Sequence, residues 1–220
     1  KCYDNLEWCW GYRETDMLGG VDPYSASKGA AELAIRSYIQ SYFPSKTSQV
    51  RIASARAGNV IGGGDWAADR IIPDCVKAWS SGNFAELRNP LSTRPWQHVL
   101  EPLSGYLILA EKLYTEGNVY AGGWNFGPRD EDVQPVEWIL NHMVQQWGTG
   151  ASWQLDTDPQ PHEAQLLKLD ISKAAAKLKW QPRWSLAQAL DSIVEWHQCW
   201  LAQKDIRQTT LNQISVYQID

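Results

Sequence analysis

Amphipathic helix patterns alternate with short buried strands along these 220 residues, and this order restricts the fold more than any other feature of the sequence. Helical periodicity follows Asp22 and ends near Pro44, because proline cannot continue a helix. The stretch SQVRIASARAGNVIG then predicts a short buried strand, starting near Val50 and Ile52, that breaks at Gly58. Alternation of this kind is typical of an α/β fold with a mostly parallel sheet.

The same patterns predict further elements downstream. Helices are expected where apolar residues fall on one face and a glycine follows the last turn. YAGGWNFGP predicts a strand, and a capping box of Ser185 and Gln188 begins a last helix that runs to about Lys204. The predicted helix faces are Ala31, Ala34, Tyr38 and Tyr42; Ile72, Cys75, Val76 and Trp79; Leu103, Leu107, Ala110 and Leu113; and Val136, Ile139, Leu140, Met143, Val144 and Trp147. Residues 205–220 show no strong pattern and are interpreted as a tail.

Composition excludes several classes of function. The net charge is −5, with acidic and basic residues interspersed, so no basic patch is predicted for nucleic acid or for an anionic membrane. No apolar run is long enough to span a membrane, and residues 1–20 lack a signal-peptide pattern, so we expect a cytoplasmic protein. The four cysteines and four histidines show no metal-ligand spacing, and no metal site is predicted.

Tyr24 and Lys28 form a Tyr-x-x-x-Lys motif at the start of the first predicted helix. Side chains four residues apart lie over one another on a helix, so the ammonium would favour the phenolate and lower the pKa of the tyrosine. A tyrosine in that setting is a general base. The alternative is a solvated helix face, because the same spacing occurs by chance in many helices.

The glycine-rich turn that binds dinucleotides is not found in the sequence. The three glycines at 62–64 follow a predicted strand, but they lead to Asp65 and Trp66 instead of opening a helix. No predicted strand is followed by G-x-G-x-x-G. The sequence therefore predicts an α/β unit without the turn that would hold the pyrophosphate of NAD.

Several longer strings resemble one known family across nearly the whole chain. They are YSASK, ARAGNVIGGGDWAADRIIPD, RPWQHVLEP, WNFGP and HEAQLLKLDISKAAAKLKWQP. Together they resemble the C-terminal part of the CDP-glucose 4,6-dehydratases, which are extended short-chain dehydrogenases/reductases acting on a nucleotide sugar. AGNVIGGGDWAADRIIPD is the most specific string, since it separates this family from its epimerase and dTDP-glucose relatives. The resemblance favours the catalytic interpretation of Tyr24 and Lys28.

The resemblance implies a fold and a domain order. The fold would be the C-terminal part of an NAD-binding Rossmann-type parallel sheet, plus a smaller α/β substrate-binding domain. Residues 1–62 would be the remainder of the Rossmann-like domain, and residues 63–204 mainly the nucleotide-sugar-binding domain, with some segments returning to the first. Residues 205–220 would be a tail. An NAD-binding half precedes this part in the family, so these 220 residues alone are expected to be inactive.

The resemblance also implies a reaction, the NAD-dependent conversion of CDP-glucose to CDP-4-keto-6-deoxyglucose. A hydride leaves C4, a proton leaves C5, the C6 hydroxyl is lost as water and the hydride returns to C6, so NAD is recycled. Tyr24 would deprotonate the 4-hydroxyl, and Lys28 would hold that tyrosine ionised and bind the nicotinamide ribose. Lys1 would take the C5 proton or stabilise the enolate; a frayed surface lysine is the alternative.

Other site residues are assigned by the resemblance alone. The segment Ala55, Arg56, Ala57 and Gly58 would run beside the nicotinamide, where small side chains permit close approach. The residues implied to bind the nucleotide sugar are Asn59, Arg70, Leu87, Arg88, Arg94, His162 and Glu163. Arg94 would grip the diphosphate with its guanidinium fork, Arg70 would contact a phosphate or ribose, and Leu87 and Arg88 would contact cytosine. The alternatives are a self-capping turn for Asn59 and solvated positions for Arg70 and residues 162–163.

Two other functions remain open at this point. A nucleotide-sugar 4-epimerase shares the Tyr-x-x-x-Lys motif but does not need Lys1, and a truncated, non-catalytic fragment would only bind a nucleotide sugar. The resemblance further implies a homo-oligomer, dimer or tetramer, with dimers built through the helix that carries Tyr24. It also implies a place in the synthesis of 3,6-dideoxyhexoses for surface lipopolysaccharide.

Overall fold

The structure is a computed structural model that describes residues 1–43, 48–156 and 164–219. Its strands form three two-stranded sheets, and each pair is parallel. The pairs are β1 (Ala53–Ala57) with β5 (Gly122–Phe126), β2 (Asn59–Ile61) with β4 (Trp96–His98), and β3 (Ala85–Leu87) with β6 (Trp153–Leu155). Parallel strands joined through helices define an α/β protein, so the predicted fold class is confirmed.

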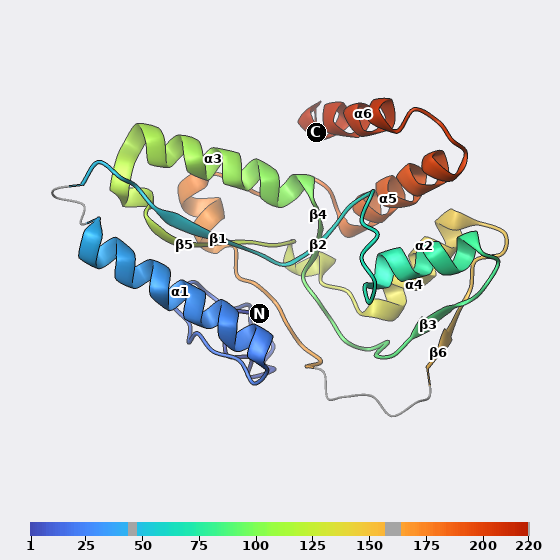
Figure 1. Cartoon of the computed structure of the whole chain (residues 1–220), viewed down its shortest axis with the longest axis horizontal. Coiled ribbons are helices and arrows are strands. Elements are labelled where there is room, and N and C mark those ends of the chain that lie inside the picture. The colour runs from blue at the N-terminus through green and yellow to red at the C-terminus, as the bar shows by residue number, and fades with distance from the viewer. Residues whose placement is uncertain (44–47, 157–163, 220) are drawn as a thin grey trace.

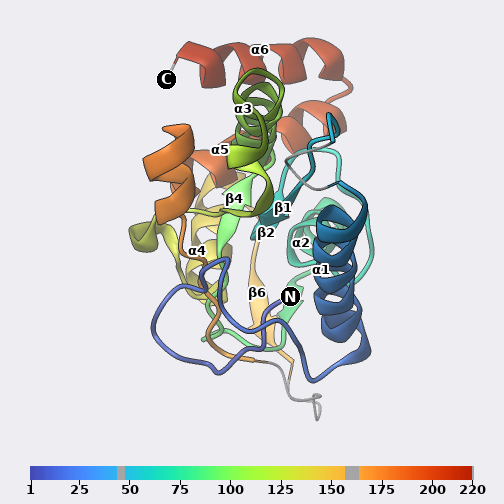
Figure 2. The same cartoon turned by 90° about the vertical axis from the view of Figure 1, so that its left-hand side faces the viewer.

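The helices lie on both sides of these strands. α1 (Pro23–Tyr42) and α3 (Leu100–Glu116) lie on opposite sides of the β1–β5 pair (Figure 1). α2 (Ile71–Ser80), α4 (Val136–Trp147) and α5 (Leu186–Leu201) gather at the other end of the molecule. α6 (Ile206–Ile219) packs on α5 and lies beside α3 (Figure 2). Short helical turns occupy Gly117–Tyr120, Asp130–Asp132 and Ala174–Leu178.

The largest apolar core joins α2, α4 and α5 to β3. Its most buried members are Ile72, Cys75, Trp79, Ile139, Leu140, Met143, Leu190 and Ile193. These include most of the residues predicted for the inner faces of the second and fourth helices, so those two predictions are confirmed. A smaller core packs α3 against β5 through Leu109, Trp124 and Phe126.

The predicted face of α3 is wrong as a core face, and the predicted face of α1 is exposed. Tyr38 and Tyr42 of α1 are 60% and 69% exposed, and Leu107 of α3 is 73% exposed. The buried residues of α1 are Ser25 and Gly29, and those of α3 are Glu101, Pro102, Gly105 and Leu109. On α3, a Cβ added to Gly105 would lie 2.3 Å from Phe126, so the helix approaches β5 more closely than a leucine stripe would allow.

Both ends of the predicted element map are also corrected. The first strand begins at Ala53, and Val50, which was predicted inside it, is 50% exposed. The predicted tail forms α6, in which the Asp205 carboxylate accepts a hydrogen bond from the Gln208 N–H at 2.9 Å. Only Tyr217 of this helix is buried, so its sequence carries almost no apolar period to detect. The capping box of Ser185 and Gln188 is confirmed.

His98 gives the fold a predictable dependence on pH. Burial lowers the pKa of His98 from 6.5 to about 4, and its Nε2 has no partner among the described residues. Above pH 6.5 the histidine is neutral whether the chain is folded or unfolded, whereas below it only the unfolded chain takes the proton readily. The free energy of unfolding should therefore fall by up to about 3 kcal/mol between pH 6.5 and 4.

Urea titrations across this pH range measure that fall. His98→Asn keeps an acceptor for the Leu100 N–H, which His98 Nδ1 binds at 3.3 Å, but cannot be protonated. The variant should lose clearly less stability on acidification than the parent protein. An equal loss in both proteins would show that His98 does not carry the effect.

Candidate active site

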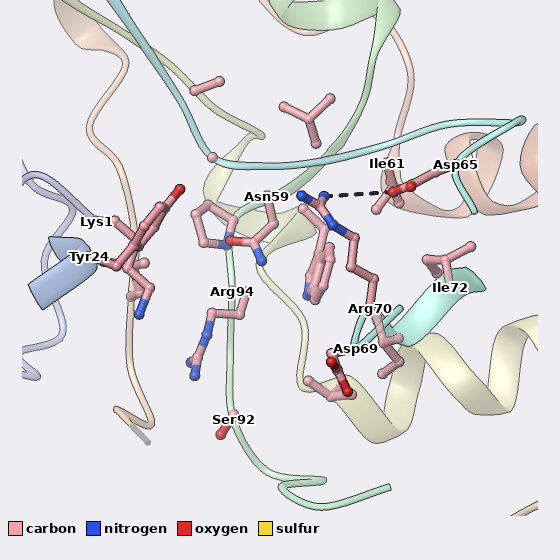
Figure 3. Close-up of a pocket in the computed structure, with 18 of the residues that line it drawn as sticks. Lys1, Tyr24, Asn59, Ile61, Asp65, Asp69, Arg70, Ile72, Ser92 and Arg94 are labelled. Carbon is pink, nitrogen blue, oxygen red and sulfur yellow. Dashed lines mark ion pairs between the residues drawn. The ribbon is translucent and has the colours of Figure 1, made fainter. Parts of the chain in front are cut away.

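A cavity of about 790 Å³ lies beside the carboxyl end of β1 (Figure 3). Open α/β folds bind ligands at the carboxyl ends of parallel strands. Every predicted site residue that the structure describes lines this cavity: Lys1, Tyr24, Lys28, Ala55, Arg56, Ala57, Gly58, Asn59, Arg70, Leu87, Arg88 and Arg94. His162 and Glu163 lie outside the described residues. The roles of these residues stay predictions.

The start of α1 sets the direction of Tyr24 and Lys28. Asp22 caps the helix, because its carboxylate accepts from the Ser25 N–H at 2.9 Å and from the Ser25 hydroxyl at 2.6 Å. Ser25 and Gly29 form the buried side of α1, and a Cβ on Gly29 would lie only 3.1 Å from the Gly19 nitrogen. The side of α1 that carries Tyr24 lines the cavity.

Tyr24 and Lys28 stand together on α1 as their spacing predicts. Lys28 Nζ lies 5.5 Å from the centroid of the Tyr24 ring, and Tyr24 is 59% exposed. The phenol is therefore accessible to a ligand in the cavity (Figure 3), and Lys28 places a cation beside its ring. This arrangement can hold and move a proton at the phenol oxygen.

Lys1 lies next to Tyr24 at the same end of the cavity (Figure 3). Its side chain is 58% exposed, and its Nζ is 3.9 Å from the Asp22 carboxylate. A lysine acts as a base most readily when it is buried or beside another cation. The side chain of Lys1 is instead exposed to solvent and lies next to the carboxylate of Asp22.

Arg56 points its guanidinium at α1. It forms an ion pair with Glu32 at 2.7 Å and donates to the Tyr3 hydroxyl at 2.7 Å, and both members of the ion pair are about nine-tenths buried. Burial opposes the charge, but the hydrogen bonds that Arg56 donates to Glu32 and Tyr3 outweigh it and raise the pKa of Arg56. The Arg56 side chain thus links β1 to α1 through Glu32. The backbone of Arg56 is then the part of this residue that could face a cofactor.

Gly58 carries the chain from β1 to β2. Its N–H donates to the Phe126 carbonyl at 3.1 Å, and the next N–H, of Asn59, donates to the Pro95 carbonyl at 2.8 Å. A Cβ on Gly58 would lie 2.2 Å from the Pro95 oxygen, so only glycine fits. The Asn59 side chain then enters the middle of the cavity (Figure 3) and has no hydrogen bond to any residue that the structure describes. It does not cap its own backbone.

Arg94 and Arg70 approach the cavity from different elements. Arg94 is 8% exposed and donates to the carbonyls of Thr93 at 2.8 Å and Gln165 at 3.2 Å. Arg70 stands at the start of α2, and its guanidinium lies 3.6 Å from the Asp65 carboxylate (Figure 3). Asp69, directly before it, has a left-handed φ of 59°, which aspartate tolerates in turns.

Leu87, at the end of β3, packs mainly in the core, whereas Arg88 after it faces the cavity. Leu87 touches the cavity but is 5% exposed and packs in the largest core, so its side chain is mostly committed to packing. Arg88 is exposed to the cavity. Sequence reasoning also missed acidic lining residues, namely Glu32, Asp65, Asp69, Asp74 and Glu86. Glu32 lies four residues after Lys28, and that helical spacing could have found it.

The fold defines the class of protein. The chain matches the dTDP-glucose 4,6-dehydratase of Bacillus anthracis in complex with NAD with a TM-score of 0.70, at 19% identity, over 90% of this chain and 58% of that one. It matches the UDP-glucuronic acid 4-epimerase of Bacillus cereus with a TM-score of 0.74, at 19% identity, over 90% and 58% of the two chains. Its fold is therefore that of the Rossmann-type nucleotide-sugar dehydratases and epimerases.

One curated protein is far more similar in sequence. The chain is 54% identical, over 220 residues and 99% of its length, to the CDP-glucose 4,6-dehydratase of Salmonella typhimurium. It spans 61% of that protein's length. The resemblance found in the sequence strings is thereby confirmed. No family model matches the chain. None of the helices in the described part of the chain combines the length and apolar character that crossing a membrane requires.

Proposed function

We propose that this chain provides the nucleotide-sugar site and the proton-transfer groups of a CDP-glucose 4,6-dehydratase. The observation that carries the proposal is one shared cavity, in which α1, the end of β1, the start of α2 and the segment before β4 bring Tyr24, Asn59, Arg70 and Arg94 together. The high identity to the Salmonella enzyme supports CDP-glucose as the substrate.

One wall of the cavity fits the nicotinamide end of NAD. Ala55, Ala57 and Gly58 leave the end of β1 with little side-chain bulk, and Tyr24 and Lys28 stand on the same wall. These residues would hold the nicotinamide and its ribose. NAD bound there supplies the acceptor and later the donor of the hydride. The sequence itself contains no glycine-rich turn for the pyrophosphate.

The chain's own residues would manage the protons of the reaction. Tyr24 takes the proton of the sugar 4-hydroxyl as C4 is oxidised, and Lys28 stabilises the resulting phenolate. The keto group at C4 makes the C5 proton acidic, and Lys1, which lines the cavity beside Tyr24, would receive it or stabilise the enolate once the bound sugar shields this lysine from water. The C6 hydroxyl then takes a proton and leaves as water, and the resulting double bond between C5 and C6 would take back the hydride at C6 and a proton at C5, so that the overall change is the loss of one water.

The diphosphate would lie between the two arginines. Arg94 places a positive charge at the cavity from an almost buried position, where backbone carbonyls of Thr93, Ala164 and Gln165 hold its planar guanidinium, and Arg70 offers a second cation from the start of α2. Asn59, between them, would donate its amide hydrogens to a phosphate or sugar oxygen.

The similarity to the Salmonella enzyme also supports the proposed domain order, in which residues 1–62 are a Rossmann-like part and residues 63–204 mainly bind the substrate. It supports a homo-oligomer as well. The cytoplasmic location predicted from the sequence also stays a proposal.

Replacing Arg94 by lysine tests the diphosphate role. Lysine keeps the charge but loses the fork, so the affinity for CDP should fall by roughly tenfold or more. Arg51→Lys is the matched control, because Arg51 also binds backbone carbonyls, those of Leu113 and Tyr114, away from the cavity. Titration calorimetry with CDP measures both variants. Equal affinity in the two would remove Arg94 from the site.

A nucleotide-sugar 4-epimerase is the second candidate, because solved epimerases share this fold as closely as the dehydratases do. The two reactions begin with the same oxidation at C4. They differ at C6, where a dehydratase releases the oxygen as water and an epimerase retains it. The fate of that oxygen therefore distinguishes the two functions.

A further inference from the structure

The cavity has two ends with different chemistry. Lys1 and Tyr24 line it beside α1, whereas α2 and β3 line it on the opposite side, with Asn59 and Arg94 between them (Figures 1 and 3). A nucleoside diphosphate sugar is an extended molecule with its hexose and its base at opposite ends. A hexose at Tyr24 and a diphosphate at Arg94 would therefore bring the base toward β3.

β3 presents alternate side chains to this end of the cavity. Ala85 and Leu87 are 3% and 5% exposed and pack in the core, while Glu86 between them is exposed and lines the cavity. The alternation follows from the two-residue period of a strand, and the pairing of Glu86 with Gln154 of β6 fixes the register. Arg88 follows on the same side as Glu86.

The two charged side chains are not held by hydrogen bonds to any residue that the structure describes, although burial raises the pKa of the Asp74 carboxyl and the charge of Arg88 partly opposes that rise. Within residues 1–43, 48–156 and 164–219, neither Glu86 nor Arg88 forms a hydrogen bond or an ion pair. An ionised carboxylate only accepts hydrogen bonds, and a guanidinium only donates them. This end of the cavity therefore offers one strong acceptor next to one strong donor.

That pair matches the edge of cytosine and not that of uracil or thymine. Cytosine carries an amino donor at position 4 beside acceptors at N3 and O2, whereas uracil and thymine carry a carbonyl acceptor at position 4. A glutamate is a known partner for the cytosine amino group. In uracil or thymine the same carboxylate would face O4, so two acceptors would meet with no hydrogen between them. This mismatch lowers the affinity for the wrong base.

We infer that Glu86 determines the choice of cytosine over uracil and thymine by accepting a hydrogen bond from the 4-amino group of the base. Arg88 donates to N3 or O2 of the same base. The inference rests on the proposed function, because it takes the hexose to lie at Tyr24. It assigns to Glu86 a role in specificity and no role in the chemistry at C4, C5 or C6.

Titration calorimetry with CDP and UDP tests the inference on the protein as the cell makes it. Glu86→Gln keeps the side-chain length, but its amide can donate to O4 of uracil. The ratio of CDP to UDP affinity should fall by about tenfold in this variant, and UDP should bind more tightly than it does to the parent protein. Asp74→Asn is the matched control, because it removes a carboxylate from the same end of the cavity. It should leave the ratio unchanged.

The outcomes separate the inference from the function on which it rests. A parent protein that prefers CDP, together with a Glu86→Gln variant that keeps the full preference, would overturn the inference and leave the proposed function standing. An equal fall in the ratio for Asp74→Asn would also overturn it, because general charge would then explain the preference. A parent protein that binds neither nucleotide, or prefers UDP, would overturn both.

Discussion

Replacing Tyr24 by phenylalanine is expected to lower the turnover of CDP-glucose by about 10³-fold and to leave CDP affinity within about twofold. The variant loses only the phenol oxygen, which takes the proton of the 4-hydroxyl in our proposal. Tyr24 is 59% exposed on a capped helix, so the substitution removes no buried contact. Single-turnover kinetics with the protein as the cell makes it measures the rate, and calorimetry measures the affinity.

Tyr38→Phe is the control for this experiment. Tyr38 lies on the same helix and is 60% exposed, but it does not line the cavity. Its substitution should leave both turnover and affinity unchanged. Normal turnover in Tyr24→Phe would remove Tyr24 from the reaction, and an equal loss in both variants would indicate a change in α1 instead.

Replacing Glu101 by alanine is expected to lower the free energy of unfolding by about 4 kcal/mol. Glu101 is 1% exposed, and its carboxylate accepts hydrogen bonds from the Arg183 N–H at 3.0 Å, the Trp184 N–H at 2.8 Å and the Tyr217 hydroxyl at 2.8 Å. Alanine would leave the two N–H groups without this acceptor, and the Tyr217 hydroxyl would keep only the Ser104 hydroxyl, 3.0 Å away. The loss should also loosen α6, because Tyr217 is the only buried residue of that helix.

Urea unfolding followed by tryptophan fluorescence measures this effect. Glu111→Ala is the control, because Glu111 lies on the same helix and is exposed, so its replacement should change the unfolding free energy by less than about 0.5 kcal/mol. Similar unfolding curves for the two variants would contradict the role of Glu101 as the link between α3, the start of α5 and α6.

The sequence correctly predicts the buried face of a helix when that face consists of apolar side chains. Ile72, Cys75 and Trp79 in α2 repeat at helical spacing because they pack in the largest core, and the period is readable for that reason. α3 packs through Gly105 and a buried glutamate, Glu101, so its leucines misled the prediction. α6 is held by hydrogen bonds at Tyr217 and Thr210, which leave no apolar stripe.

The residues of the candidate site also fall into those that a sequence pattern identifies and those that only the packing reveals. Tyr24, Asn59 and Arg94 were found because they lie in strings that resemble a family, and the fold brings them to one cavity. Glu86, at the opposite end, lies outside the strings that carry the resemblance. Its position depends on which side of β3 faces the core, and that becomes known only when the packing of Ala85 and Leu87 is known.

The fate of the C6 oxygen tests the central claim most directly. The protein as the cell makes it is incubated with NAD and CDP-glucose labelled with oxygen-18 at C6, and the mass of the product sugar is measured. We predict CDP-4-keto-6-deoxyglucose without the label, which is released as water. A product that retains the label, with only the configuration at C4 changed, would contradict the dehydratase account and establish an epimerase.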